Sequence, residues 1–166
     1  MKLEINKTSF KDAIKFLEKD DILGKYVKNI EPPKININED YFFSLCRYII
    51  FQQLSIKSAS ATFSRFTNLL NNNISAEQVL KQTEIKLKNT GMSFKKVEYL
   101  RILSQSFIDN SSYEDLEKMS NDDVIKTLSS IKGIGTWTAE MFLIFSMGRI
   151  DVFSNKDIGL LNAIKI

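Results

Sequence analysis

The stretch Ile131-Lys132-Gly133-Ile134-Gly135-Thr136-Trp137-Thr138-Ala139 decides the fold of this chain. Before it, Ser120 is followed three residues later by Asp123, a capping-box-like pattern that predicts the start of a helix. After the two glycines, Thr136 is expected to cap a second, apolar helix that stops at Gly148. The sequence therefore predicts two helices joined by a tight turn.

This predicted hairpin covers residues 120–148 and turns at Gly133-Ile134-Gly135. Glycine has no Cβ and tolerates positive φ, so the backbone of the turn can come close to another molecule. The N–H groups at the start of the second helix favour an anion such as phosphate. An ordinary helical hairpin is the alternative, and two glycines alone do not decide between the two interpretations.

A second segment follows the hairpin, Asp151-Val152-Phe153-Ser154-Asn155-Lys156-Asp157-Ile158-Gly159-Leu160, with Asp157 twenty residues after Trp137. In residue type and spacing, hairpin and segment resemble the helix-hairpin-helix DNA glycosylase superfamily, specifically its 3-methyladenine DNA glycosylase II group. The resemblance spans about residues 9–164 and implies the all-α fold of that superfamily. Ser154 stands where the family often has proline, so the approach to Asp157 is expected to be looser.

The resemblance implies that Asp157 is the catalytic residue. A carboxylate aimed at the sugar stabilises the positive charge that develops as the bond to the base breaks; helix capping is the alternative role for this aspartate. Trp137 stands where bifunctional relatives carry a catalytic lysine, which implies a monofunctional enzyme. Trp137 and Met141, one helical turn later, are expected to line the substrate pocket, although both residue types are also common in cores.

Further segments are similar to the DNA-contacting parts of the family. The run Ile49-Ile50-Phe51-Gln52-Gln53-Leu54-Ser55 resembles a helix tip that approaches the minor groove, with position 53 filling the gap left by the extruded base. Thr90 to Leu100 resembles a glycine, serine and lysine segment in which Lys95 and Lys96 would contact phosphate. The residues expected to bind DNA are Gln52, Gln53, Ser55, Lys95, Gly133, Ile134, Gly135 and Thr136. The family also implies a Na⁺ or K⁺ ion at the backbone of Ile131 and Ile134; no other cofactor is expected.

Composition narrows the function classes. The 166 residues carry a net charge of +3 with a pI of about 8.9, which permits a nucleic-acid partner. Histidine is absent, which excludes a histidine-based triad and a histidine zinc site. The basic residues are mostly lysines, which favour contact with the DNA backbone over reading of base sequence. The single cysteine, Cys46, lies in an apolar helical pattern and is expected in the core.

The remaining pattern is helical throughout. Apolar periodicity and capping residues predict further helices after Ser9, over residues 22–30 up to Pro32-Pro33, from Phe42 to about Gln52, after Ser55, Ser75 and Ser93, and near Leu116. Residues 36–39 are expected to form a loop. We expect one domain over residues 1–166 that lacks the last C-terminal helices usual in the family, as a truncated chain would.

The sequence thus predicts a DNA-3-methyladenine glycosylase type II that removes alkylated purines from duplex DNA in base excision repair. The alternatives are a non-catalytic helix-hairpin-helix DNA-binding module and, less favoured, a helical protein-interaction domain. We expect a monomer that does not enter membranes and lies in the cytoplasm, associated with the nucleoid if the source is prokaryotic.

Overall fold

The computed structural model describes residues 7–28, 30–31, 37–38 and 40–164 of the chain. The described part contains helices and no strand, which confirms the predicted all-α fold. In chain order the helices are α1 (Lys7–Leu17), α2 (Gly24–Val27), α3 (Tyr41–Phe51), α4 (Ile56–Leu69), α5 (Ala76–Lys81), α6 (Glu84–Asn89), α7 (Phe94–Asp109), the 3₁₀ helix η1 (Ser111–Lys118), α8 (Asn121–Ser129), α9 (Thr136–Phe145) and α10 (Ile158–Ile164). None of these helices is long and apolar enough to cross a membrane.

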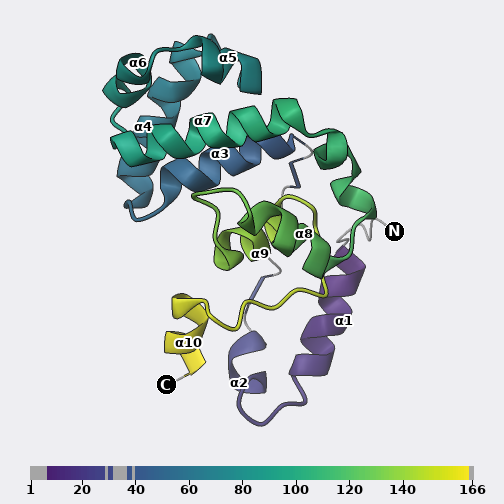
Figure 1. Ribbon diagram of the computed structural model, residues 1–166. Coiled ribbons are helices and arrows are strands. Elements are labelled where there is room, and N and C mark those ends of the chain that lie inside the picture. The colour runs from purple at the N-terminus through teal and green to yellow at the C-terminus, as the bar shows by residue number, and fades with distance from the viewer. Residues whose placement is uncertain (1–6, 29, 32–36, 39, 165–166) are drawn as a thin grey trace.

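Helices α3 and α7 lie side by side through the middle of the molecule (Figure 1). Helices α5 and α6 pack on α7 at one end, and the hairpin of α8 and α9 lies on the opposite side of the α3–α7 pair. Helices α1, α2 and α10 occupy the end furthest from α5 and α6. The central pair of α3 and α7 therefore supports the hairpin.

The core joins the apolar faces of α3, α7, α8 and α9 with side chains from α4, α5, α6 and η1. Its completely buried side chains include Leu45, Ile49, Ile50, Leu100, Leu103, Leu128, Phe142 and Leu143. Each such side chain stabilises the fold by about 1.5–3 kcal/mol relative to leaving it in water. Cys46 is also buried, as predicted, and burial raises the pKa of its thiol well above the ordinary value.

Serine caps fix where the core helices begin. The four predicted caps accept a hydrogen bond from the backbone N–H three residues further on: Ser55 from Ser58, Ser75 from Gln78, Ser93 from Lys96 and Ser120 from Asp123. Each bond satisfies one of the donors that a helix start leaves open. These helix starts are therefore confirmed.

Other predicted boundaries were wrong. Thr136 is the first residue of α9 and not its cap; Gly135 occupies the cap position and has no side chain to bond. The first helix begins at Lys7, ahead of Ser9. The second helix, predicted over residues 22–30, covers only Gly24–Val27. The Asp20 carboxylate accepts the N–H groups of Ile22 and Leu23 in the turn just before it. Pro32, Pro33 and part of the loop at 36–39 lie outside the described residues.

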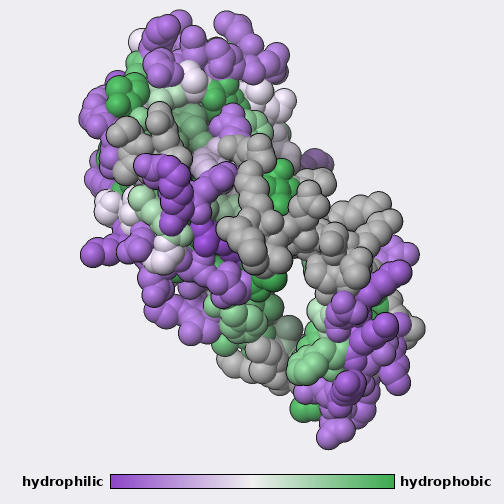
Figure 2. Space-filling view, turned by 90° about the vertical axis from the view of Figure 1, so that its right-hand side faces the viewer, coloured by the Kyte–Doolittle hydropathy of each residue, from purple (hydrophilic) through white to green (hydrophobic). Residues whose placement is uncertain are grey.

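Apolar side chains remain exposed at the end of the molecule that holds α1, α2 and α10. They include Phe16, Ile22, Leu23 and Tyr26 beside α1 and α2, and Ile158, Leu160 and Leu161 on α10. Figure 2 shows hydrophobic surface on both sides of a gap in the lower half of the molecule, whereas the upper end is mostly hydrophilic.

The two glycines of the hairpin have different reasons to be glycine. Gly133 has a φ of +100°, and a Cβ built on it would lie 2.3 Å from Cγ of Tyr99, on α7. Gly135 has an ordinary φ of −94°, and a Cβ built on it meets nothing within 4 Å. Packing inside the protein thus requires glycine at 133 and leaves position 135 open.

We predict that Gly133→Ala destabilises the fold by about 2 kcal/mol or more, because the alanine would need a strained backbone and would clash with Tyr99. For a chain of this size the midpoint of thermal unfolding should fall by roughly 4–8 °C. Gly135→Ala is the matched control and should change the free energy of unfolding by less than about 1 kcal/mol. Equal losses of stability in the two variants would contradict this account.

Candidate functional site

The turn between α8 and α9 leaves the start of α9 open to solvent. The Ile134 N–H donates to the Ile131 carbonyl at 3.0 Å, and both isoleucine side chains are buried, so the turn is anchored from inside. Gly135 provides no side-chain cap, and Thr136 is exposed. Backbone N–H groups at an uncapped helix start attract anions. The described geometry fits the predicted approach of a phosphate to this turn.

Asp157 and Trp137, twenty residues apart in sequence, meet at the surface. The indole Nε1–H of Trp137, in the first turn of α9, donates to Asp157 Oδ2 at 2.7 Å. The other carboxylate oxygen, Oδ1, accepts the Leu160 N–H at 2.9 Å, so Asp157 also caps α10. The capping bond uses one carboxylate oxygen and the bond from Trp137 uses the other, so the catalytic role of Asp157 stays a prediction beside its capping role.

The carboxylate of Asp157 is stabilised in its charged form. The bond from the Leu160 N–H is the largest cause, the bond from Trp137 is the next, and together they lower the pKa of Asp157 below the ordinary value for aspartate. The group is consequently ionised at neutral pH. A fixed negative charge with ordered donors is the arrangement that stabilises a developing cation.

The loop before Asp157 is tied to α9 by a second polar pair. The Ser154 hydroxyl donates to Glu140 Oε2, and the two residues are only 1% and 9% exposed. The Asp157 N–H in turn donates to the Ser154 carbonyl at 3.2 Å. Serine at this position does not loosen the approach to Asp157, contrary to expectation. Where the family often has the rigid ring of a proline, the Ser154 hydroxyl makes a buried hydrogen bond to Glu140.

Glu140 is a site residue that sequence analysis missed. It lies one helical turn after Trp137, so both side chains of α9 reach toward the Asp157 loop. The available signal was a single charged residue inside the apolar run from Ala139 to Phe145. A buried carboxylate needs a partner, which predicts a polar contact but does not say with which residue.

The tip between α3 and α4 contacts the hairpin directly. The Gln52 side chain donates from Nε2 to the Gly133 carbonyl at 2.9 Å, so this predicted DNA-binding residue joins two parts of the protein. Gln53 is exposed, with a φ of +56°. Ser55 caps α4 and is also exposed. Contact of Gln53 and Ser55 with DNA stays a prediction.

The lysines near the tip have distinct surroundings. Lys95 is exposed, with Nζ 5.8 Å from the centre of the Tyr99 ring. Lys96 donates from Nζ to the carbonyls of Ile50 and Gln52 at 2.7 and 2.8 Å. Lys132, in the hairpin, pairs with Glu98 across an exposed surface. The side chain of Lys95 thus remains the one most suited to a phosphate among these three.

Two further predicted site features, a pocket role for Met141 and a cation at the hairpin, stay predictions. Met141 is partly buried on α9, and its carbonyl accepts the Tyr48 hydroxyl at 3.3 Å; a place in the substrate pocket stays a prediction. The Ile131 carbonyl accepts the Ile134 N–H, which leaves that oxygen one further lone pair for a cation. Within the described residues no cluster of cysteine, aspartate or glutamate is arranged to hold a metal.

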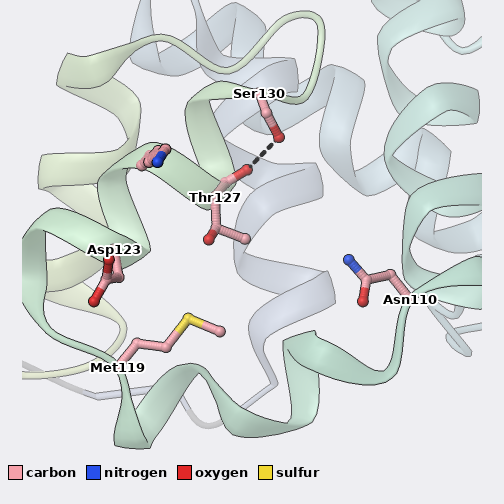
Figure 3. A pocket seen from close by; sticks show the side chains of 6 residues that line it. Asn110, Met119, Asp123, Thr127 and Ser130 are labelled. Atoms are coloured by element: carbon pink, nitrogen blue, oxygen red, sulfur yellow. Dashed lines mark hydrogen bonds between the residues drawn. The ribbon is translucent and has the colours of Figure 1, made fainter.

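A separate surface hollow of about 560 Å³ lies beside α8 (Figure 3). Its lining is polar except for one methionine, and none of the predicted site residues belongs to it. The lining residues are Asn110, Met119, Asp123, Lys126, Thr127 and Ser130. The cavity is therefore distinct from the site formed by Asp157, Trp137 and the hairpin.

Comparison with known proteins gives consistent matches. The model of the family described as HhH-GPD superfamily base excision DNA repair protein matches residues 46–166. The chain is 33% identical over 144 residues to DNA-3-methyladenine glycosylase 1 of Schizosaccharomyces pombe, covering 84% of this chain and 63% of that protein. It is 34% identical over 149 residues to DNA-3-methyladenine glycosylase of Saccharomyces cerevisiae, covering 81% and 48%.

The fold of this chain is also similar to that of a solved DNA glycosylase structure. The Schizosaccharomyces pombe 3-methyladenine DNA glycosylase Mag1, in complex with abasic DNA, is similar with a TM-score of 0.83 and 30% identity, covering 93% of this chain and 79% of that one. This chain spans about half to just under two thirds of the length of the two curated relatives. Because the matched region carries both the hairpin and the Asp157 segment, this chain belongs to the HhH-GPD superfamily of base excision DNA repair proteins.

Proposed function

We propose that this protein is a monofunctional DNA-3-methyladenine glycosylase that hydrolyses the N-glycosidic bond of alkylated purines in duplex DNA. The observation that carries the proposal is the ionised Asp157 carboxylate, held between the Leu160 N–H and the indole of Trp137 on the helix that starts at the hairpin. The names of the relatives support the same activity, and Mag1 was solved with abasic DNA.

The reaction begins when one nucleotide is extruded from the duplex, which costs a few kcal/mol. The bond between C1′ and the base nitrogen then breaks, and the electron pair leaves with the base. Positive charge develops on the sugar next to the Asp157 carboxylate, which stabilises it. A water oxygen forms the new bond to C1′ and loses a proton to Asp157 or solvent, leaving an abasic sugar.

A monofunctional mechanism is supported by the side chain at position 137. Strand-cleaving relatives form a Schiff base through a lysine amine, and an indole has no such amine. Here the indole N–H is already used by Asp157. The nearby Lys132 is paired with Glu98. The expected product is therefore an abasic site in an uncut strand.

We include in the proposal a Na⁺ or K⁺ ion held by hairpin carbonyls, those of Ile131 and Ile134. Carbonyl oxygens suit such hard cations, and the Ile131 carbonyl retains a lone pair beyond its bond to the Ile134 N–H. A cation bound there would add positive charge where the hairpin meets phosphate.

We predict that Asp157→Asn lowers the single-turnover rate of N7-methylguanine excision by about 100-fold or more, because the charge facing the sugar is lost. Asparagine can still accept the Leu160 N–H, so thermal unfolding and binding to an abasic duplex should hardly change. The amide group that replaces Oδ2 cannot accept the indole N–H, so the fluorescence of Trp137, the only tryptophan, should report the loss of this one bond. Excision at the parent rate would leave Asp157 with only the capping role, whereas a parent protein that binds duplex DNA and excises no base would favour the non-catalytic DNA-binding module.

We predict that Gly135→Ala weakens duplex binding about tenfold while leaving stability intact. A methyl group in the open space beside Gly135 would keep a phosphate away from the α9 N–H groups. Loss of one charge-assisted hydrogen bond costs about 1.5 kcal/mol, which is roughly a factor of ten in affinity. Fluorescence anisotropy with an undamaged duplex measures the effect, and unchanged affinity would place the phosphate elsewhere.

We predict faster excision of cationic methylpurines than of neutral lesions. N7-methylguanine and N3-methyladenine carry positive charge while still bonded to the sugar, so they leave as neutral bases without a general acid. The chain has no histidine, and Asp157 is held ionised. The face of Trp137, which is 44% exposed, can add about 0.5–2 kcal/mol of attraction for a cationic base.

Single-turnover rates on matched duplexes decide this preference. N7-methylguanine should leave much faster than 8-oxoguanine or hypoxanthine, and the product strand should stay intact until alkali is added. Faster release of 8-oxoguanine would overturn the substrate assignment, and strand cleavage without alkali would overturn the monofunctional mechanism.

A further inference from the structure

The C-terminal end of α3 is held by a lysine from another helix. The last carbonyls of a helix have no partner within that helix. Lys96, in the first turn of α7, donates from Nζ to the Ile50 carbonyl at 2.7 Å and to the Gln52 carbonyl at 2.8 Å. A cation at this position also opposes the negative end of the helix dipole. Lys96 is therefore the cap of α3, although it lies more than forty residues further along the chain.

The capped end leads directly into a strained turn. Gln53 has a φ of +56°, a left-handed conformation that residues other than glycine rarely adopt. Such a conformation persists only when the surrounding structure holds it. The Leu54 N–H donates to the Phe51 carbonyl at 3.3 Å and closes the turn. One of the two carbonyls that Lys96 bonds belongs to Gln52, the residue immediately before the strained position.

The hairpin fixes the same turn from the other side. The Gln52 side chain donates to the Gly133 carbonyl at 2.9 Å, and Gly133 packs closely on Tyr99 of α7. Lys96 and Tyr99 lie one helical turn apart on α7. The α3–α4 tip thus contacts Lys96, and the hairpin contacts Tyr99, in the same short stretch of α7. These two contacts keep Gln53 at a fixed position relative to the start of α9.

Lys95 and Lys96 differ in what their charges can do. Lys95 is exposed, with Nζ over the Tyr99 ring, so its ammonium group can meet a phosphate. Lys96 is partly buried, burial lowers the pKa of its ammonium group, and two of its three N–H donors are directed at carbonyls. The sequence predicts phosphate contact for both lysines, whereas their contacts in the structure give them different roles.

We propose that Lys96 is a positioning residue: its ammonium group fixes the left-handed turn that presents Gln53 to the DNA, and it does not itself neutralise a phosphate. This inference rests on the proposed function for the part that concerns DNA. Lys96 acts through Gln53, which would occupy the space left by the extruded base. Lys95 instead places its positive charge near the phosphates of the DNA backbone.

The test compares Lys96→Met with Lys95→Met, two neighbouring variants that lose the same charge. Affinities for an undamaged duplex and for a duplex containing an abasic-site analogue are measured over a range of salt concentrations. Lys95→Met should lower the salt slope by about 0.9, the contribution of one phosphate contact, and leave the preference for the abasic duplex unchanged. Lys96→Met should leave the slope unchanged and lower that preference by about tenfold.

A double-mutant cycle tests whether Lys96 acts through Gln53. Gln53→Ala should lower the preference for the abasic duplex and the rate of N7-methylguanine excision, and adding Lys96→Met should lower them little further. Lys96→Arg, which keeps a cation with several donors, should retain most of the preference. Should Lys96→Met not fold, Lys96→Gln enters the same cycle, because its amide can still donate to one carbonyl. Additive losses in the cycle, or a salt slope for Lys96→Met that matches Lys95→Met, would overturn the proposal.

Hydrogen exchange without DNA separates this inference from the proposed function. The N–H of Leu54, which closes the turn, should exchange faster in Lys96→Met and at the parent rate in Lys95→Met. A parent protein that neither prefers the abasic duplex nor excises N7-methylguanine would refute the proposed function. Unchanged exchange at Leu54 in Lys96→Met would refute the positioning role whatever the activity.

Discussion

The close packing of Gly133 against the ring of Tyr99 sets the geometry on which the rest of the site depends. A side chain at this position would clash with the ring, so the turn between α8 and α9 can lie directly against Tyr99 of α7. The carbonyl of the same glycine accepts the Gln52 side chain, which brings the α3–α4 tip to the hairpin. Trp137 lies in the first turn of α9, four residues after Gly133, so this contact holds the turn from which that part of the site begins.

Helix ends supply most of the electrostatics of the site. The uncapped start of α9 offers N–H groups to an anion, and the start of α10 holds the Asp157 carboxylate in its charged form. The end of α3 is neutralised by Lys96 from inside the protein. The groups that attract an anion and the group that carries negative charge therefore lie at different helix ends, which suits the proposed binding of a phosphate and the proposed stabilisation of a cationic sugar.

The loop that carries Asp157 is held by hydrogen bonds to α9. Glu140 and Ser154 tie the loop before Asp157 to α9, one turn from the bond between Trp137 and Asp157. A buried polar group without a partner is costly, so the loop cannot leave α9 without breaking this buried hydrogen bond. Family membership is established over residues 46–166, and the catalytic activity is a proposal for a chain that matches part of the length of its relatives.

The sequence by itself determined the all-α fold, the helix starts at Ser55, Ser75, Ser93 and Ser120, and the pairing of hairpin and Asp157 segment. The helices and their starts depend on contacts between residues a few positions apart. The hairpin and the Asp157 segment are recognised by the spacing between them, which can be compared directly with that of a family. It misplaced the start of α9 because a glycine cap has no side chain that a pattern can reveal.

Only the tertiary structure distinguished Gly133 from Gly135 and Lys96 from Lys95, and only it paired Gln52 with Gly133 and Glu140 with Ser154. Each distinction depends on a partner between 14 and 81 positions away in sequence. Neighbouring residues of the same type look alike in a sequence, because their roles are decided by which surface of the packed helices each side chain faces.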